Sequence, residues 1–214
     1  MESRRFTFLD RLVGGLDQAV HTILGPAPAQ SSANPAASVA EHELTDTERE
    51  LAGRLMRVDH AGEIAAQALY QGQALSARLP AVREKMEQAA HEENDHLRWT
   101  EERIQELGTH TSYLAPLWYG GSFAIGLLAG AAGDHWSLGF VAETEHQVMA
   151  HIDSHLDRLP HADEKSRAIL EQMRADESRH ATVAIEAGAA ELPTPVRRLM
   201  AAASRFMTQT AFWI

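Results

Sequence analysis

Two short motifs in the chain place a carboxylate and an imidazole three residues apart. The first is Glu93-x-x-His96, in the segment HEENDHL, and the second is Glu177-x-x-His180, in DESRH. Residues three apart project from the same face of a helix, so each pair can present an oxygen and a nitrogen ligand to one point. One such pair alone is weak support for a metal site, since the chain is rich in Glu and contains 12 histidines.

Apolar residues flank both motifs at helical spacing. The first motif shares its stripe with Met86, Leu97 and Ile104, and the second shares its stripe with Leu170 and Met173. Both pairs are therefore expected to point into a hydrophobic core, where an unpaired carboxylate is costly. A metal ion would remove that cost, which makes a buried metal site the favoured interpretation.

Each motif is preceded along the chain by a further glutamate on an apolar stripe. Glu63 lies in the segment RVDHAGEIAAQALYQGQ, and Glu145 lies in ETEHQV. Glu143 competes with Glu145, but its position two residues earlier places it about 200° round the helix, toward solvent. The interval from each of these glutamates to the next motif is similar, at 30 and 32 residues. The pattern predicts two similar helix pairs and a site with approximate twofold symmetry.

The charge of the four core glutamates indicates what they bind. Neither lysine of the chain, Lys85 or Lys165, lies on their stripes to neutralise them. Two divalent cations would neutralise the centre, and Glu and His ligands suit iron or manganese. Four Glu and two His on four helices match the ferritin-like di-metal arrangement. The alternative is four protonated or solvent-reaching glutamates in a purely structural bundle. The predicted metal ligands are Glu63, Glu93, His96, Glu145, Glu177 and His180.

Three other histidines could assist this centre. His60 precedes Glu63 by three residues and could orient a metal ligand through a hydrogen bond. His151 and His155 lie near the Glu145 face of their helix and could relay protons. The alternative for each is a core histidine that has its own hydrogen-bond partner. No catalytic residue is predicted beyond the metal ligands themselves.

Helical periodicity and end signals place these residues on four long helices. Thr45 and Glu48 fit a capping box at the start of the first helix. No window alternates apolar and polar residues for long enough to predict a strand. We therefore expect an all-α, ferritin-like four-helix bundle with an N-terminal amphipathic helix and an extra C-terminal helix. The expected limits are Thr45 to Leu79, Pro80 to Gly108, a third helix ending near Leu159, Asp163 to Gly188, and about 195–212 for the last helix.

The N-terminal part of the chain divides into two segments before the main domain at 45–214. Residues 1–24 carry apolar residues at spacings of three and four, which predicts an amphipathic helix docked on the domain or lying on a membrane surface. Asp10 and Asp17 interrupt the apolar run that a secretory signal would need. Residues 25–44 are rich in Pro, Ala and Ser, and we expect a flexible linker that buries nothing.

Two segments have the composition of membrane-contacting helices. Residues 111–133 contain no charge over 23 residues, although five glycines and Pro116 dilute their hydrophobicity. A membrane span, a lipid-facing helix and a buried bundle helix lined with small residues all remain open. Residues 195–214 carry three arginines and no acid. They could lie on an anionic membrane surface, close one end of the bundle, or do both.

The overall composition excludes several other classes of protein. A net charge of −11 argues against a general nucleic-acid binder, which needs a basic face. The absence of cysteine excludes disulfides, zinc fingers, iron–sulfur clusters and thiol nucleophiles. A metal must therefore be held by carboxylate and imidazole.

Six segments together resemble the demethoxyubiquinone hydroxylases of ubiquinone biosynthesis, a family of di-iron enzymes. The segments are RVDHAGEIAAQALYQGQ, HEENDHL, the glycine-rich apolar stretch, ETEHQV, DESRHA and MTQTAFWI. The resemblance covers about residues 47–214. It implies two iron ions at the same six positions, and hydroxylation with O₂ of the ring of a polyprenylated methoxy-benzoquinol.

The resemblance also implies a peripheral membrane monooxygenase on the cytoplasmic face of a bacterial inner membrane. Residues 111–133 and 195–214 are expected to form a lipid-facing entrance for the quinol. Partner proteins could be a second copy of the chain or other proteins of ubiquinone biosynthesis, but not nucleic acid. The alternative function is a ferritin-like iron oxidase or storage protein, which would not need the apolar segment. The aromatic residues expected near the membrane interface are Trp118, Tyr119, Trp136, Phe206 and Trp213.

Overall fold

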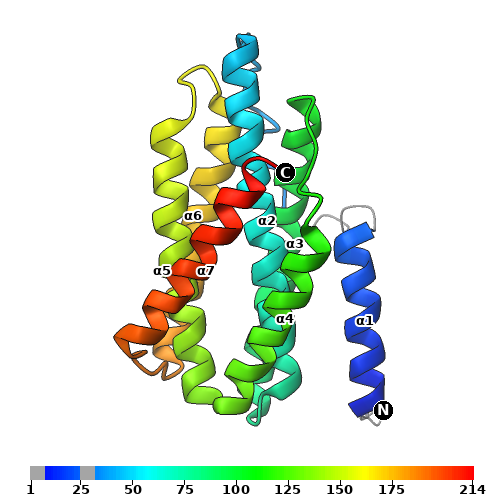
Figure 1. Cartoon of the computed structure of the whole chain (residues 1–214), viewed down its shortest axis with the longest axis vertical. Coiled ribbons are helices and arrows are strands. Elements are labelled where there is room, and N and C mark those ends of the chain that lie inside the picture. Colours follow the sequence, from blue (N-terminus) through cyan, green and yellow to red (C-terminus); the bar gives the residue numbers. More distant parts are fainter. Residues whose placement is uncertain (1–7, 25–31) are drawn as a thin grey trace.

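The computed structural model describes residues 8–24 and 32–214, and in these ranges all regular structure is helical. This confirms the expected all-α bundle (Figure 1). Residues 1–7 and 25–31 of the two N-terminal segments lie outside the described residues. The helices are α1 (Phe8–Leu24), α2 (Asp46–Ser76), α3 (Pro80–Glu106), α4 (Ala115–Ala132), α5 (Asp134–Arg158), α6 (Glu164–Glu186) and α7 (Thr194–Ala211).

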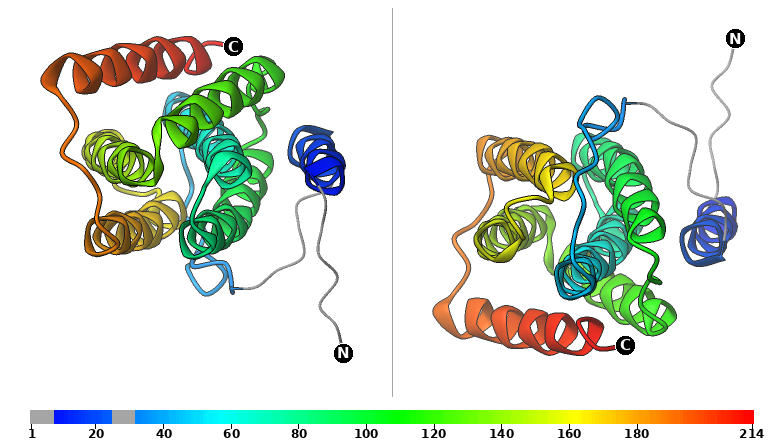
Figure 2. Two further views of the ribbon diagram at one scale, coloured as in Figure 1. Left: turned by 90° about the horizontal axis from the view of Figure 1, so that it is seen from below. Right: turned by 90° about the horizontal axis from the view of Figure 1, so that it is seen from above.

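Four of these helices, α2, α3, α5 and α6, form the central bundle. Helix α2 packs on α3, α5 packs on α6, and further contacts of α2 with α5 and of α3 with α6 join the two pairs. Helices α4 and α7 lie on one side of this bundle, and α1 lies outside it, next to α2 and α4 (Figures 1 and 2). The paired arrangement is the one that the repeated spacing of glutamates predicted.

The ends of the long helices follow the signals in the sequence. The side chain of Thr45 accepts a hydrogen bond from the Glu48 amide at 3.3 Å, and the Glu48 carboxylate accepts one from the Thr45 amide at 2.9 Å. Pro80 is the first residue of α3. Gly108 and Gly188 adopt φ angles of 72° and 98° after α3 and α6, a conformation that favours glycine.

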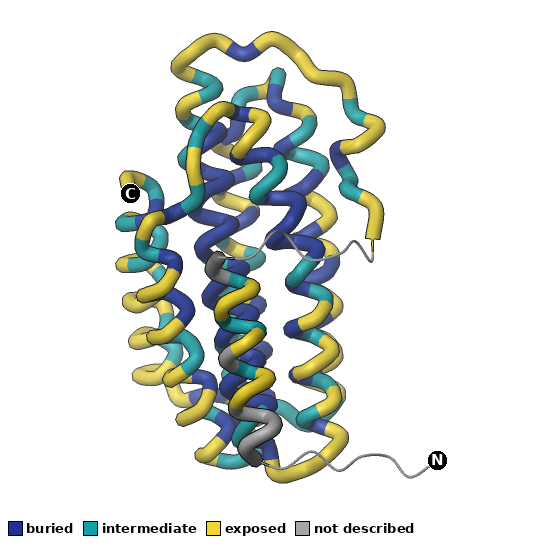
Figure 3. The backbone as a smooth tube through the Cα atoms, turned by 90° about the vertical axis from the view of Figure 1, so that its right-hand side faces the viewer, coloured by how far each residue is buried: buried dark blue, intermediate teal, exposed yellow. Residues whose placement is uncertain are grey.

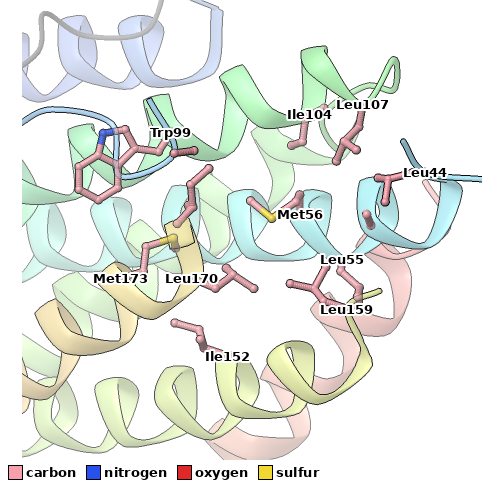
Figure 4. Packing of buried hydrophobic residues seen from close by; sticks show 13 residues of the cluster. Leu44, Leu55, Met56, Trp99, Ile104, Leu107, Ile152, Leu159, Leu170 and Met173 are labelled. Carbon is pink, nitrogen blue, oxygen red and sulfur yellow. The ribbon is translucent and has the colours of Figure 1, made fainter. Parts of the chain in front are cut away.

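Two apolar clusters fill the bundle on either side of a polar layer. One cluster contains Met56, Trp99, Ile152 and Met173, packed as Figure 4 shows. The other contains Tyr70, Met86, Val141 and Ala184. On each of the four helices, the predicted metal-ligand positions lie between the residues that enter the two clusters. The glutamates are therefore enclosed along the bundle axis by apolar side chains that exclude water.

The apolar segment 111–133 contains α4, which packs closely along α2. A Cβ atom at Gly126 would lie 2.2 Å from the carbonyl oxygen of Leu69, and a Cβ at Gly72 would lie 2.3 Å from that of Phe123. The two backbones can approach this closely only because both positions lack a side chain. Among the described residues, no helix has the length and apolar character needed to cross a membrane.

The close approach of α2 and α4 makes Gly126→Ala a destabilising substitution. The added methyl group would meet backbone that cannot move aside without separating the helices. We expect a loss of about 1–3 kcal/mol in the free energy of unfolding, measured by urea denaturation. Gly120 lies on the same helix, and a Cβ atom there would meet no atom within 4 Å, so Gly120→Ala is the control. It should stabilise the protein by about 0.5–1 kcal/mol; equal effects of the two changes would contradict the packing argument.

The expectation that residues 25–44 bury nothing is wrong for the described part, 32–44. Ala36 and Leu44 are buried in the apolar cluster with Trp99. Glu41 forms ion pairs with Arg103 at 3.0 Å and with Lys165 at 2.9 Å. The segment is therefore held on the outside of α3 and α6, mainly by polar partners that its composition did not indicate.

Because of these ion pairs, we expect part of the stability of the protein to be lost at acidic pH. Burial opposes ionisation of Glu41, but Arg103 and Lys165 outweigh it and lower its pKa from 4.5 to about 2. Because the pKa of Glu41 is lower in the folded state, its ion pairs stabilise the protein fully above the pKa of the unfolded state. This stabilisation is lost as the pH falls through the pKa of the folded state. We expect Glu41→Gln to be less stable than the wild type at neutral pH. Thermal unfolding should show this difference shrinking between about pH 4.5 and pH 2; a constant difference would contradict it.

Both α4 and α7 have many exposed residues (Figure 3), and large apolar side chains are among them. Leu128 and Leu199 are each 71% exposed, and Phe206, Trp136 and Trp213 are exposed as expected. The expectation is wrong for two residues, because Trp118 and Tyr119 of α4 are buried. Trp118 faces α7, where its ring lies 6.1 Å from that of Phe206, and Tyr119 faces α2.

Candidate metal centre

The six predicted ligands meet in the interior of the bundle, in the layer between the two apolar clusters. Helix α2 contributes Glu63, α3 contributes Glu93 and His96, α5 contributes Glu145, and α6 contributes Glu177 and His180. All six are buried, with at most 8% of any residue exposed.

Their ligand atoms form two groups, each able to hold a metal ion. Within each group, one ligand atom per residue lies within 4.8 Å of all the others. Glu93 and Glu177 belong to both groups. These two carboxylates could therefore help to hold an ion in each group. The first group adds Glu63 and His96, and the second adds Glu145 and His180.

The structure distinguishes Glu145 from its competitor Glu143. Glu145 is 1% exposed, and its Oε1 accepts no hydrogen bond from the described residues. Glu143 is half-buried on another face of α5, and its carboxylate accepts a hydrogen bond from Gln147 at 2.6 Å. A buried carboxylate oxygen without a partner is costly, so the position of Glu145 fits a metal ligand.

Each histidine presents Nδ1 to the glutamates and is held from behind through Nε2. Nδ1 of His96 lies 2.9 Å from Glu93, and its Nε2 donates to Asp176 at 3.2 Å. Nδ1 of His180 lies 3.0 Å from Glu177, and its Nε2 donates to Glu92 at 2.7 Å. A histidine whose Nε2 carries the proton has its Nδ1 lone pair free for a metal.

Burial and repulsion act on the pKa values of these glutamates. Burial and the charge of Glu93 raise the pKa of Glu63 well above its usual value. Burial and the charge of Glu177 do the same for Glu145. Burial also opposes ionisation of Glu93, but the charge of His96 and nearby hydrogen bonds outweigh it and lower its pKa. The centre thus resists holding four negative charges by itself, and two divalent ions would supply the missing positive charge.

Most of the chain is similar to known proteins. Residues 50–211 match the family described as "Ubiquinone biosynthesis protein COQ7".

The chain belongs to this family.

Three relatives of this COQ7-family chain carry the name 3-demethoxyubiquinol 3-hydroxylase. The protein of Nitrosococcus oceani is 62% identical over 214 residues, which are 100% of both chains. That of Nitrosospira multiformis is 57% identical over 206 residues, covering 96% of this chain and 99% of the relative. That of Acinetobacter baumannii is 52% identical over 211 residues, covering 99% and 100%. The resemblance seen in the sequence motifs is confirmed.

Sequence reasoning missed the two carboxylates that hold the histidines of this COQ7-family chain. Glu92 and Asp176 each stand immediately before the Glu of an E-x-x-H motif, and each binds the histidine of the opposite motif. Arg179 joins the two, donating to Asp176 at 2.7 Å and to Glu92 at 3.3 Å. The doubled acids in HEENDH and ADESRH were the available signal.

The three histidines expected to assist the centre lie outside both groups in the described part of the chain. His155 is about 15 Å along α5 from Glu145. It donates from Nδ1 to Asp59 at 2.8 Å, and the ring of His151 lies 4.3 Å from its ring. His60 is buried, which lowers its pKa to about 4. Roles for these residues in orienting ligands or relaying protons stay predictions.

Proposed function

We propose that this chain is a di-iron 3-demethoxyubiquinol 3-hydroxylase. Its substrate would be a polyprenylated methoxy-benzoquinol, to which it adds a ring hydroxyl group from O₂ during ubiquinone biosynthesis. The observation that carries this proposal is the pair of buried Glu/His groups that share Glu93 and Glu177. The family membership and the names of the relatives support the substrate and the reaction.

In this proposal the six buried residues hold two iron ions, and the remaining groups control their surroundings. Iron bound there would supply the redox chemistry that activates O₂. Glu93 and Glu177, which belong to both groups, would help to hold both ions, while Asp176 and Glu92 would keep the Nδ1 atoms of the histidines directed inward. The two apolar clusters would keep bulk water away from the reacting groups.

The proposal is tested by expressing the chain in cells that lack this hydroxylation and analysing their quinones by mass spectrometry. We expect the demethoxy precursor to fall and ubiquinone to appear. Unchanged accumulation of the precursor would count against the function. Iron analysis of the purified protein separates the iron-storage alternative, which predicts many irons per chain rather than about two.

We further propose that the protein binds the membrane surface peripherally through α4 and α7, on the cytoplasmic face of a bacterial inner membrane. A quinol with a long isoprenoid tail resides in the bilayer, so the enzyme must approach it there. The two helices lie on one side of the bundle (Figure 2). They expose apolar side chains, and α7 also exposes Arg198 and Arg205. Exposed apolar and basic residues together favour an anionic lipid surface.

Acidic substitutions on α7 test this surface. Replacing Leu199 and Phe206 together by Glu should weaken binding to anionic liposomes at least about tenfold in a co-sedimentation assay, because each apolar side chain loses its burial in lipid. Ile185 is 53% exposed on α6, on the other side of the bundle, so Ile185→Glu is the control and should bind normally. Equal binding by all three proteins would rule out α7 as the contact.

A further inference from the structure

A cavity of about 320 Å³ lies between α1 and the helices α2, α3 and α4. Its walls include Leu75 and Ala90 from the bundle and Phe123 from α4. Gly14 and Gly15 of α1 face it without side chains, so α1 covers the space and does not fill it. Figure 2 shows α1 on this side, outside the bundle. The cavity has room for a small, flat and largely apolar molecule.

One end of this cavity carries a polar group without a partner. Gln71 is only 9% exposed, and its Oε1 accepts a hydrogen bond from the hydroxyl of Tyr119. Burial raises the pKa of Tyr119 to about 12, so the hydroxyl remains a donor. Nε2 of Gln71 is buried and forms no hydrogen bond with any described residue. A buried N–H group without an acceptor is unfavourable, and a ligand oxygen would satisfy it.

A polar stripe on α2 connects this end of the cavity with the metal centre. Glu63, Gln67 and Gln71 follow one another at intervals of four residues, so they lie on one face and span about 12 Å along the helix. Gln67 is fully buried between them, where it donates to the carbonyl oxygen of Ala90 and to Asn94. The side chain of Gln67 therefore lies between this end of the cavity and the centre.

We propose that this cavity is a subsite that recognises the ring of the quinol, with Nε2 of Gln71 donating a hydrogen bond to a ring oxygen. The identity of the ligand rests on the proposed function. A methoxy-benzoquinol ring has apolar faces and oxygen atoms at its edge. The cavity offers apolar walls for the faces, and among its polar side chains, those of Gln18, Gln71, Glu87 and Tyr119, the Gln71 amide is the buried donor without a partner. The parallel rings of Tyr119 and Phe123, inclined by 9°, add aromatic surface beside that donor.

Binding of a short-tailed quinone to the metal-free protein tests the subsite without relying on catalysis. The probe is a methoxy-methyl-benzoquinone with a single prenyl unit, and the dissociation constant is measured by calorimetry. Gln71→Leu should raise it about tenfold, because the variant keeps the size of the side chain but loses the donor. Gly15→Leu should also raise it about tenfold or more by occupying the cavity. A Cβ at position 15 meets no atom within 4 Å, so this variant should fold normally.

The matched control lies in a larger cavity of about 1080 Å³ between α5 and α7, which Gln209 lines. Gln209→Leu makes the same chemical change there and should bind the quinone like the wild type. Unchanged binding by Gln71→Leu and Gly15→Leu would overturn the subsite, as would a loss of binding in Gln209→Leu or no binding by the wild type. If the cells described above are nevertheless rescued, the hydroxylase function stands and only the subsite fails.

Discussion

Replacing Glu93 or Glu177 by Gln is expected to remove both metal ions from the protein at once. Each of these carboxylates belongs to both ligand groups, so its loss affects both positions. An amide has the shape of the carboxylate but lacks its charge and cannot bridge two cations in the same way. We expect the metal content to fall from about two ions per chain to nearly none, with loss of hydroxylation. Inductively coupled plasma analysis of the purified variants measures this.

The outer glutamates provide the matched control for that experiment. Glu63 belongs only to the first group and Glu145 only to the second. Glu63→Gln and Glu145→Gln should each weaken one position and retain about one ion per chain. Neither change should unfold the protein, because burial raises the pKa of both carboxyls and an amide resembles their neutral form. A full metal content in Glu93→Gln and Glu177→Gln would refute the shared arrangement.

The second large effect concerns the carboxylates behind the histidines. Asp176→Asn should lower the affinity of the metal position that contains His96 by about 10- to 100-fold, because the imidazole exchanges a charged acceptor for a neutral amide oxygen, which holds its orientation less strongly and makes it a weaker ligand. The contact crosses from α6 to α3, with a distance of 3.2 Å between Nε2 and Oδ2. The affected position should be that of Glu63 and His96, although Asp176 is adjacent in sequence to Glu177. Titration of the metal-free protein with Co²⁺, followed by its visible absorption, measures both affinities.

Glu92→Gln is the reciprocal change and should weaken the position that contains His180. A pair of variants that affect opposite positions distinguishes this arrangement from general damage to the site. Arg174 is a suitable control on α6, because it pairs with Asp153 on the surface, away from the centre. Arg174→Ala should bind Co²⁺ normally. If Asp176→Asn instead weakened the His180 position, the crossed hydrogen bonds would be wrong.

Sequence patterns determined the elements and the residues that meet at the centre. The period of apolar residues placed the helices, and capping and glycine signals gave their ends at Thr45, Gly108 and Gly188. Helical spacing also favoured Glu145 over Glu143, because the face of a residue on a helix follows from its number alone. These properties depend on neighbours within a few residues, and such neighbours can be read from the chain.

Only the tertiary structure decided which partners meet across helices. Asp176 and Glu92 pair with the histidines of the opposite motif, and residues 32–44 are fixed on the bundle by Arg103 and Lys165. Tyr119 is buried and donates a hydrogen bond to Gln71, although it was expected near the membrane interface. Each of these contacts joins residues far apart in sequence, so it depends on how the helices are rotated and how closely they pack. Local periodicity fixes which face of a helix is apolar, but the atoms that this face meets are set by the packing of the whole bundle.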